Sequence, residues 1–246
     1  MKNIIFMFFI VLCSLSCSAY NSNKKIIGIG DYIIGVIENE KIQFYEMIFF
    51  NNDKKVEFEI LNGKDMILPY EYTDVIDTEL GIGIIFKNLI KFYDGNEPFF
   101  SENFQWELIS DVDMILPNEY TGVIRIDRYI GVIVKNNIQF YEYIYENKTW
   151  QIIPDVDMAL PNRYKNVFGC SLGIGLIINN KIEFFDYNFE NKNWIKISGA
   201  DMILPNNFRN VFGLGSKYLG VFIDNVIQIF EYRNDIWDNI YNVELI

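Results

Sequence analysis

The apolar positions of this chain recur with a period of about 45 residues, in short runs separated by turn-forming residues. The runs are rich in Val, Ile, Phe, Tyr and Trp, and Asn, Gly and Pro lie between them. This composition is typical of β-strands, and no stretch shows the spacing of an amphipathic helix. The pattern therefore predicts an all-β protein.

The clearest repeat is the sequence Asp-Met-x-Leu-Pro. Its four copies start 48, 44 and 44 residues apart, at Asp65, Asp113, Asp157 and Asp201. The last three residues, Glu244-Leu245-Ile246, are a truncated fifth copy. Near-identical segments at such an interval indicate a repeated supersecondary unit.

Three further elements keep a fixed place in every unit. An apolar, glycine-rich segment follows Leu-Pro, and a hairpin with Asn or Asp in its turn comes next. The hairpins start at Gly35, Gly83, Gly131, Gly175 and Gly220. An aromatic residue then stands seven residues before each motif acid, at Phe58, Trp106, Trp150, Trp194 and Trp237.

Four strands per unit of this length predict a β-propeller with five blades of four antiparallel strands, called a to d from the axis outward. The expected single domain covers residues 24–246. Its blades are expected at about 24–68, 72–116, 120–160, 164–204 and 208–246. We expect the motif to end strand d, and the large rings of strand d to fill the gap between neighbouring sheets. The glycine that opens strand b predicts a close approach of backbones.

Charge and composition exclude several functions. The 246 residues carry a net charge of −12, which disfavours binding to nucleic acid or anionic lipid. Histidine is absent, so Ser-His-Asp and Cys-His catalysis and imidazole zinc sites are excluded. We expect no cofactor and no metal.

The N-terminus predicts export. Lys2 precedes the apolar run 4–12, which is too short to span a membrane, so residues 1–19 form a signal segment. Two processing routes stay open. Ser14-Leu15-Ser16 before Cys17 resembles the lipobox of bacterial lipoproteins, which implies lipidation of Cys17; cleavage after Ala19 is the alternative. The expected location is the cell envelope as a lipoprotein, or a secreted or periplasmic state. Cys170 is expected to be a small buried apolar residue.

The order Leu-Pro-x-x-aromatic, apolar strand, hairpin and Asn-Trp resembles the tachylectin-type propeller lectins, as in 208–232 and Asn193-Trp194. This resemblance implies five blades that bind acetylated amino sugars between them. Asp-Met-x-Leu-Pro stands where that family has Gly-Gly-Trp. The segment 86–94 also resembles hemopexin-like repeats, a family of four blades.

In a propeller, the d-to-a connections and the b–c turns share one face. Acids, amides and aromatic rings there are suited to sugar hydroxyls and to stacking. The candidate ligand-binding residues are Asp65, Asp113, Asp157, Asp201, Asn118, Asn162, Asn206, Tyr72, Tyr120, Tyr164 and Phe208. A structural role is the alternative for each, with the acid bonding the loop and the ring packing between blades.

Three other features each allow two interpretations. Asp111/Asp113 and Asp155/Asp157 resemble a calcium Asp-x-Asp pair, although further ligand spacing is missing. The off-pattern residues Asp77, Arg125 and Asp127 form either a site at the channel mouth or an axial salt bridge, which we favour. The long connection 95–102 either contacts a partner or folds back on its own blade.

The sequence thus predicts a binding module rather than an enzyme, with a glycan or a protein as its partner. Carbohydrate recognition through repeated sites between blades is the first hypothesis. A protein-interaction scaffold is the second. A glycosidase-like hydrolase using paired carboxylates is the third, because that chemistry needs no histidine.

Overall fold

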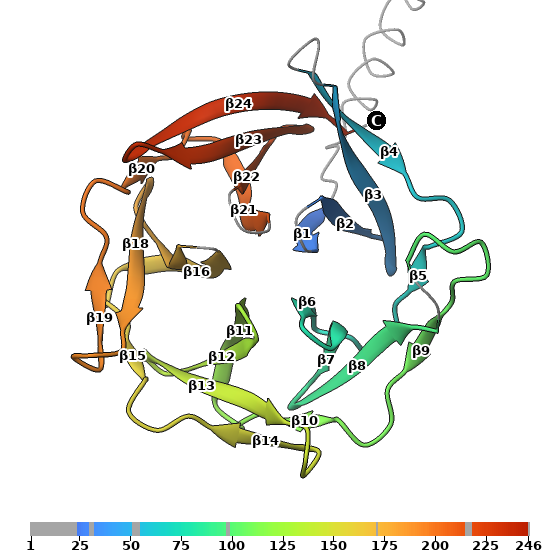
Figure 1. The fold of residues 1–246 in the computed structure, drawn as a ribbon, viewed down its shortest axis with the longest axis horizontal. Coiled ribbons are helices and arrows are strands. Elements are labelled where there is room, and N and C mark those ends of the chain that lie inside the picture. Colours follow the sequence, from blue (N-terminus) through green and yellow to red (C-terminus); the bar gives the residue numbers. More distant parts are fainter. Residues whose placement is uncertain are drawn as a thin grey trace, which may run out of the picture.

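The chain forms a five-bladed β-propeller (Figure 1). The structure is a computed structural model, and it describes residues 24–29, 32–50, 55–96, 99–170, 172–214 and 218–245. The expected signal segment and Cys17 lie outside the described residues. No described helix is long and apolar enough to cross a membrane.

Each blade is one antiparallel sheet made from a continuous stretch of chain. Blade 1 contains β1 (Lys25–Ile29), β2 (Ile33–Glu38), β3 (Lys41–Phe50), β4 (Lys55–Ile60) and β5 (Met66–Ile67). Blade 2 contains β6 (Asp74–Thr78), β7 (Gly81–Phe86), β8 (Leu89–Gly95), β9 (Trp106–Leu108) and β10 (Met114–Ile115). Blade 3 contains β11 (Tyr120–Ile126), β12 (Tyr129–Val134), β13 (Asn137–Ile144), β14 (Thr149–Ile152) and β15 (Met158–Ala159).

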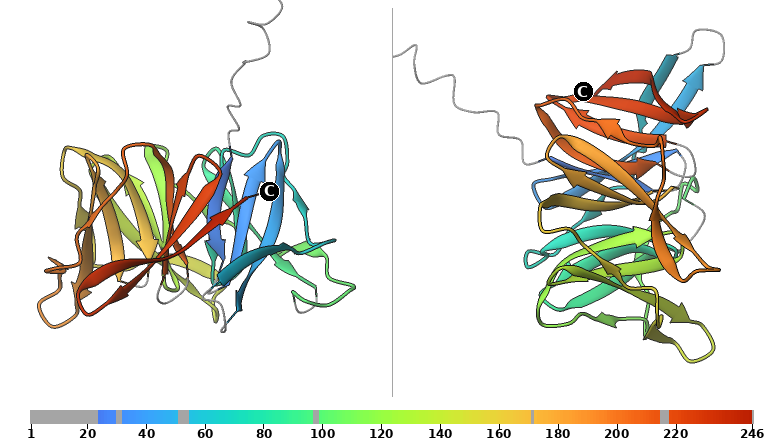
Figure 2. Two further views of the ribbon diagram at one scale, coloured as in Figure 1. Left: turned by 90° about the horizontal axis from the view of Figure 1, so that it is seen from above. Right: turned by 90° about the vertical axis from the view of Figure 1, so that its left-hand side faces the viewer.

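The last two blades follow the same order. Blade 4 contains β16 (Tyr164–Cys170), β17 (Gly173–Ile178), β18 (Lys181–Asn188), β19 (Asn193–Lys196) and β20 (Met202–Ile203). Blade 5 contains β21 (Phe208–Leu214), β22 (Tyr218–Ile223), β23 (Val226–Arg233) and β24 (Ile236–Glu244). The first strand of each blade lies next to the central axis, and the sheets stand side by side as a disk (Figure 2).

The outer strand d is broken in blades 1 to 4 and continuous in blade 5. In blade 1, β4 pairs with the second half of β3, while β5 pairs with its first two residues. Two residues before the motif acid, the backbone turns to positive φ, at Gly63, Asp111, Asp155 and Gly199. Gly and Asp tolerate this conformation. The Asp-x-Asp pairs are therefore explained by backbone geometry.

The motif has the position predicted for it, at the end of strand d. In blade 1, the Met66 side chain points into the core and Ile67 points outward, and Leu68 is buried again. The backbone N–H of Leu68 donates to the carbonyl of Glu40 in the b–c turn, at 2.8 Å. The corresponding leucines make the same bond in the other four blades. This bond fixes the d-to-a connection against the hairpin, so both lie on one face, which we call the motif face.

The glycine of strand b has a different cause from the one predicted. A Cβ at Gly175 would lie 2.3 Å from the ring of Phe168 on strand a. The glycine therefore makes room for a side chain of its own sheet, and the predicted close approach of backbones is wrong at this position. Backbones do approach closely at the axis, where a Cβ at Gly169 would lie 1.5 Å from the carbonyl oxygen of Arg125.

Tryptophan joins each blade to the preceding one, as its predicted place in the gap requires. Trp150 on β14 of blade 3 stacks on Phe92 of blade 2, with ring centroids 5.2 Å apart. Its indole N–H also donates to the carbonyl of Val112, directly before the motif of blade 2, at 2.8 Å. The equivalent bonds run from Trp106 to Lys64, from Trp194 to Val156, and from Trp237 to Ala200. Four of the five junctions therefore share one buried polar joint.

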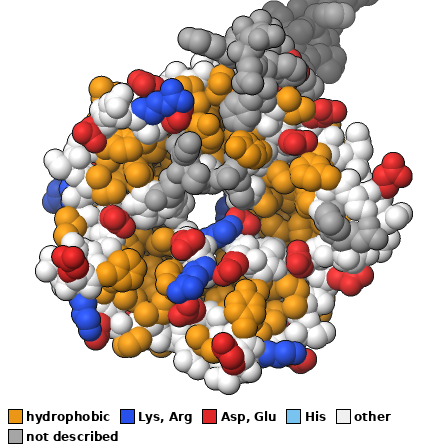
Figure 3. All heavy atoms as spheres, viewed as in Figure 1, with side chains coloured by type: hydrophobic (Ala, Val, Ile, Leu, Met, Phe, Trp, Pro, Cys, Tyr) orange, Lys and Arg blue, Asp and Glu red, His pale blue; other side chains and the backbone are white. Residues whose placement is uncertain are grey.

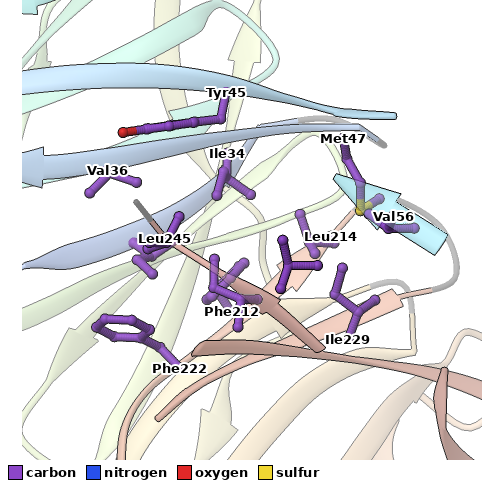
Figure 4. Close-up of a cluster of buried hydrophobic side chains, with 13 residues drawn as sticks. Ile34, Val36, Tyr45, Met47, Val56, Phe212, Leu214, Phe222, Ile229 and Leu245 are labelled. Atoms are coloured by element: carbon purple, nitrogen blue, oxygen red, sulfur yellow. The ribbon is translucent and has the colours of Figure 1, made fainter. Parts of the chain in front are cut away.

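The fifth junction, between blades 5 and 1, closes the ring by apolar packing (Figure 4). Leu245 and Phe212 pack with Ile34 and Val36 of blade 1. Phe58 takes the place of tryptophan here, and Ile229 takes the place of the phenylalanine beneath it. Phenylalanine has no N–H, so this junction lacks the polar joint of the other four.

Candidate functional site

The motif face repeats one arrangement of exposed amides at the blade junctions. After each Leu-Pro, the chain makes a four-residue turn closed by the N–H of the next strand, as from Tyr164 to the Pro161 carbonyl at 3.2 Å. The residue after the proline therefore stands at the turn tip and is exposed, as Asn162 is. The candidate amides Asn118 and Asn206 occupy the same exposed place in neighbouring junctions.

The b–c turn brings a second amide to the same place. The side-chain N–H of Asn136 donates to Oδ1 of Asn162 at 3.1 Å, and both residues are exposed. Sequence reasoning did not assign a binding role to Asn136 or to its counterparts Asn88 and Asn180. The signal was available, because the turns of blades 2 to 5 carry asparagine at the same point of the repeat, with Asn225 in blade 5.

The motif acids contact the next residue of the same hairpins. Asp157 accepts a hydrogen bond from Asn137 at 3.0 Å, so the acid and Asn162 are held by adjacent residues of the chain. Asp65 forms an ion pair with Lys41, which has the place of Asn137 in blade 1. Asp201 is bound by Lys181 and by Lys196, the latter at 3.2 Å. Each of these acids therefore ties strand d to the start of strand c.

The two lysines lower the pKa of Asp201. Its partial burial acts to raise the pKa of the carboxyl, but the hydrogen bonds from Lys181 and Lys196 outweigh this, so the pKa is lowered. Asp113 differs, since Leu89 occupies the place of the lysine and no described residue forms an ion pair with Asp113. Asp65, Asp157 and Asp201 therefore each contact a side chain of a neighbouring strand rather than the loop.

The aromatic candidates are half-buried. Tyr72, Tyr120, Tyr164 and Phe208 pack against the apolar clusters between blades. The hydroxyl of Tyr120 also donates to the carbonyl of Lys87 in the b–c turn of the preceding blade. Burial raises the pKa of Tyr72, helped by Glu40 and Asp74. Each ring is thus partly covered by the apolar packing between blades.

A central cavity of about 1040 Å³ is lined by the strands nearest the axis. At one equivalent position around the axis, the first strands of three blades have glycine. The other two blades have Asp77 and Arg125 there, and these form the axial ion pair that we favoured from the sequence. Arg125 Nε also donates to the carbonyl of Asp127 at 2.8 Å. Nearer the motif face, Lys25 pairs with Asp74. Both pairs bind one blade to the next.

Cys170 also lines this cavity. Burial raises the pKa of its thiol to about 12, which outweighs the opposite effect of a backbone hydrogen bond at Leu172. Cys170 packs at the edge of the cluster between blades 4 and 5. Cys170 packs among apolar side chains as predicted, but its exposed area makes it half-buried, so the prediction of a buried residue holds only in part.

The face opposite the motif face carries the a–b turns and the c–d connections. Acidic and basic side chains gather around the central opening on this face (Figure 3). The long connection of blade 2 folds back on the propeller here. Phe104 is buried, and Phe99 packs edge-on against Phe44 and Trp106. Lys64 donates to the carbonyl of Ser101 and lies 5.1 Å from the Phe104 ring centre.

Phe100 of this connection is 63% exposed. Asn96 and Glu102 are exposed as well, whereas Gly95, Phe99 and Ser101 are half-buried, so the described part of the connection folds back only in part. Among the described residues, no group of three or more acids, cysteines or histidines is arranged to hold a metal ion.

Comparisons with known proteins add no identity. No family model matches the chain, and no curated protein matches it. A solved chain of the S. cerevisiae core factor is 11% identical, with a TM-score of 0.47, and the match covers 90% of this chain and 41% of that chain. This chain thus spans about two fifths of the length of that chain. At this level of similarity nothing about function follows, and the architecture stands on the strand pairing of the chain itself.

Proposed function

We propose that the protein is a binding module that recognises carbohydrate through the amide pairs at its blade junctions. The propeller fold is consistent with a binding module. The observation that carries the carbohydrate proposal is the exposed pair Asn136–Asn162, with Asp157 held by the next residue of the hairpin and Tyr164 half-buried two residues after Asn162. Carboxamide and carboxylate groups present the donors and acceptors that vicinal hydroxyls need.

Repetition of this arrangement supports a multivalent mode of binding. Asparagines stand at the two equivalent positions of the adjacent junctions, Asn88 with Asn118 and Asn180 with Asn206. Several weak sites on one rigid face bind a branched or repeating ligand far more tightly than one site does. A polymeric glycan is therefore the ligand class that this face favours.

A glycan array tests the proposal. The wild-type chain is expected to bind a subset of glycans, and the triple variant N118A/N162A/N206A is expected to lose that binding. Asn147→Ala is the matched control, because it removes an exposed amide from a c–d connection on the opposite face. Failure of the wild type to bind any glycan, or full binding by the triple variant, contradicts the proposal. Hydrolysis of a bound glycan would instead favour the hydrolase alternative.

A protein-interaction scaffold is the second candidate, and a different surface favours it. The variable residue of the motif points outward on the rim of the disk, where Ile67, Ile115 and Ile203 are 72%, 75% and 66% exposed. Exposed apolar residues repeated on one surface are typical of protein contacts. Copurification of one partner that is lost in I67S/I115S/I203S would support this role.

Export to the cell envelope is part of the same proposal. It rests on the apolar N-terminal run and on Cys17. Membrane fractionation of wild type and Cys17→Ser distinguishes the two processing routes. Lipidation predicts that the variant leaves the membrane fraction, whereas cleavage after Ala19 predicts no change.

A further inference from the structure

A second cavity, of about 1020 Å³, lies on the opposite face between blades 1 and 2. Two departures from the five-fold repeat meet there. One is the axial pair Asp77–Arg125, which replaces the glycines of the other blades. The other is the long connection of blade 2, which contributes Phe99, Phe100 and Phe104. The junction of blades 1 and 2 therefore has a surface that differs from the equivalent surfaces of the repeat.

One acid in the second half of strand c recurs in every blade, and its contacts in blades 3 and 5 indicate which ligand groups this surface suits. In blade 3 that acid is Glu142, and Arg128 of the a–b turn binds it at 3.0 Å. The same guanidinium lies 5.1 Å from the ring centre of Tyr129, the first residue of strand b. In blade 5 the acid is Glu231, which pairs with Arg233. Twice, therefore, the chain itself places a guanidinium against this carboxylate.

Blades 1 and 2 have the acid without the arginine. Their acids are Glu46 and Asp94, which both line the cavity, and Tyr32 and Leu80 occupy the place of Arg128. No described residue forms an ion pair with Glu46 or Asp94. Arg125, which also lines the cavity, is already bound by Asp77. Asp94 Oδ1 accepts the backbone N–H of Gly95 at 2.8 Å, and within the described chain no cation meets the charge of Glu46 or Asp94.

Aromatic rings lie beside these carboxylates. Tyr32 is 51% exposed and Phe100 is 63% exposed, and Trp106 lies deeper in the wall. Phe100 is held by an edge contact with Phe99, whose centroid is 5.9 Å away. A planar cation gains from a carboxylate and from a ring face together, and guanidinium is suited to both. Blade 3 shows this combination within the same molecule.

We propose that the cavity between blades 1 and 2 binds a guanidinium-bearing ligand, with Glu46 and Asp94 as its carboxylate partners. The site is on the face opposite the proposed glycan sites and does not depend on them. Its ligand is cationic, whereas the amide pairs of the motif face suit neutral hydroxyl groups. Failure of one proposal therefore leaves the other standing.

The indole N–H signal of Trp106 in two-dimensional ¹H–¹⁵N spectra of the full chain reports on the cavity. N-acetylarginine amide is the probe, and its neutral isostere N-acetylcitrulline amide is the control ligand. A saturable shift at Trp106, with at least tenfold weaker binding of the citrulline ligand, is expected. Equal binding of both ligands, or no shift at Trp106 at any soluble concentration, overturns the proposal.

Two substitutions identify the carboxylates. Glu46→Gln and Asp94→Asn are each expected to weaken binding by about three- to tenfold, the effect of one charged hydrogen bond at a partly exposed site. Glu190→Gln is the matched control, because it removes an exposed acid from a c–d connection of blade 4. Unchanged affinity in both cavity variants overturns the assignment.

A third variant uses the blade 3 arrangement. Leu80→Arg gives blade 2 the arginine that blade 3 has, and the new side chain is expected to compete with the probe and weaken its binding. Thermal unfolding of each variant confirms that the fold is intact. The affinity of a pentapeptide with a central arginine is then compared with that of the amide probe. Tighter binding of the pentapeptide indicates a polypeptide ligand, and equal affinity indicates a small molecule.

Discussion

The indole N–H of Trp150 donates to the carbonyl oxygen of Val112 at 2.8 Å, across the junction of blades 2 and 3. Val112 is buried, and it directly precedes the motif acid Asp113. The hydrogen bond thus connects the predicted tryptophan position with the predicted motif. The two repeats that were recognised separately in the sequence are the two halves of one joint.

Trp150→Phe is expected to destabilise the protein by about 1–3 kcal/mol, because it leaves the Val112 carbonyl buried without a donor. The ring still stacks on Phe92, so the apolar contact is largely kept. Urea unfolding of the variant measures the loss. Unchanged stability would show that the indole bond contributes nothing to the joint.

Gly169→Ala is expected to cost more than about 3 kcal/mol, since the new Cβ would lie 1.5 Å from the carbonyl oxygen of Arg125. Gly63→Ala is the matched control. Gly63 has φ of +74° but open space around it, so only backbone strain of about 1–2 kcal/mol is expected. Thermal unfolding of both variants separates the steric effect from the conformational one. A similar loss in both would contradict the close approach at the axis.

The lowered pKa of Asp201 predicts a contribution to acid stability. The group is more acidic in the folded chain than its ordinary value of 3.8, so its contribution is present above that pH. The contribution is lost as pH falls through the folded pKa. Asp201→Asn should therefore lower the melting temperature at pH 6 and converge with the wild type near pH 2.

Asp113→Asn is the control for this measurement, because Leu89 replaces the lysine there. It is expected to change the melting temperature by a similar small amount at pH 6 and at pH 2. A difference between the Asp113 variant and the wild type that disappears in acid, as for Asp201, would show that the lysine pairs are not the cause.

Cys170 is expected to resist alkylation in the folded protein. With a thiol pKa of about 12, about one thiol in ten thousand is ionised at pH 8. Iodoacetamide labelling followed by peptide mapping should leave Cys170 unmodified until urea unfolds the chain. Rapid labelling of the native protein would contradict its burial.

The repeat in the sequence was enough to predict the class, the number of blades and the roles of several residues. Tryptophan at one fixed place in four units indicated the inter-blade position, and the structure confirms it. The axial pair Asp77–Arg125 was also predictable, because opposite charges replace glycine at one register. These features depend on the spacing of repeated residues, which can be read directly from the sequence.

Other features depend on backbone conformation, which cannot be inferred from the spacing of residues. The break in strand d follows from positive φ at Gly63 and its counterparts, and these residues looked like half of a calcium pair in two blades. Positive φ in two hairpin turns falls on Lys87 and Lys135 rather than on the neighbouring asparagine. The asparagine is left free to meet the residue after the proline, and this contact could not be predicted from residue type alone.

The junction of Phe58 with Ile229 gives the ring one joint of a different kind. Separating blades 2 and 3 would strip a hydrogen bond from a buried carbonyl, whereas separating blades 5 and 1 would expose only hydrocarbon at the equivalent place. Dispersion forces tolerate small displacements better than a directional bond does. The seam between blades 5 and 1 therefore lacks the directional bond at its outer strand, and its hydrogen bond lies at the axis instead, from the Asn210 side chain to the Ile26 carbonyl at 2.6 Å.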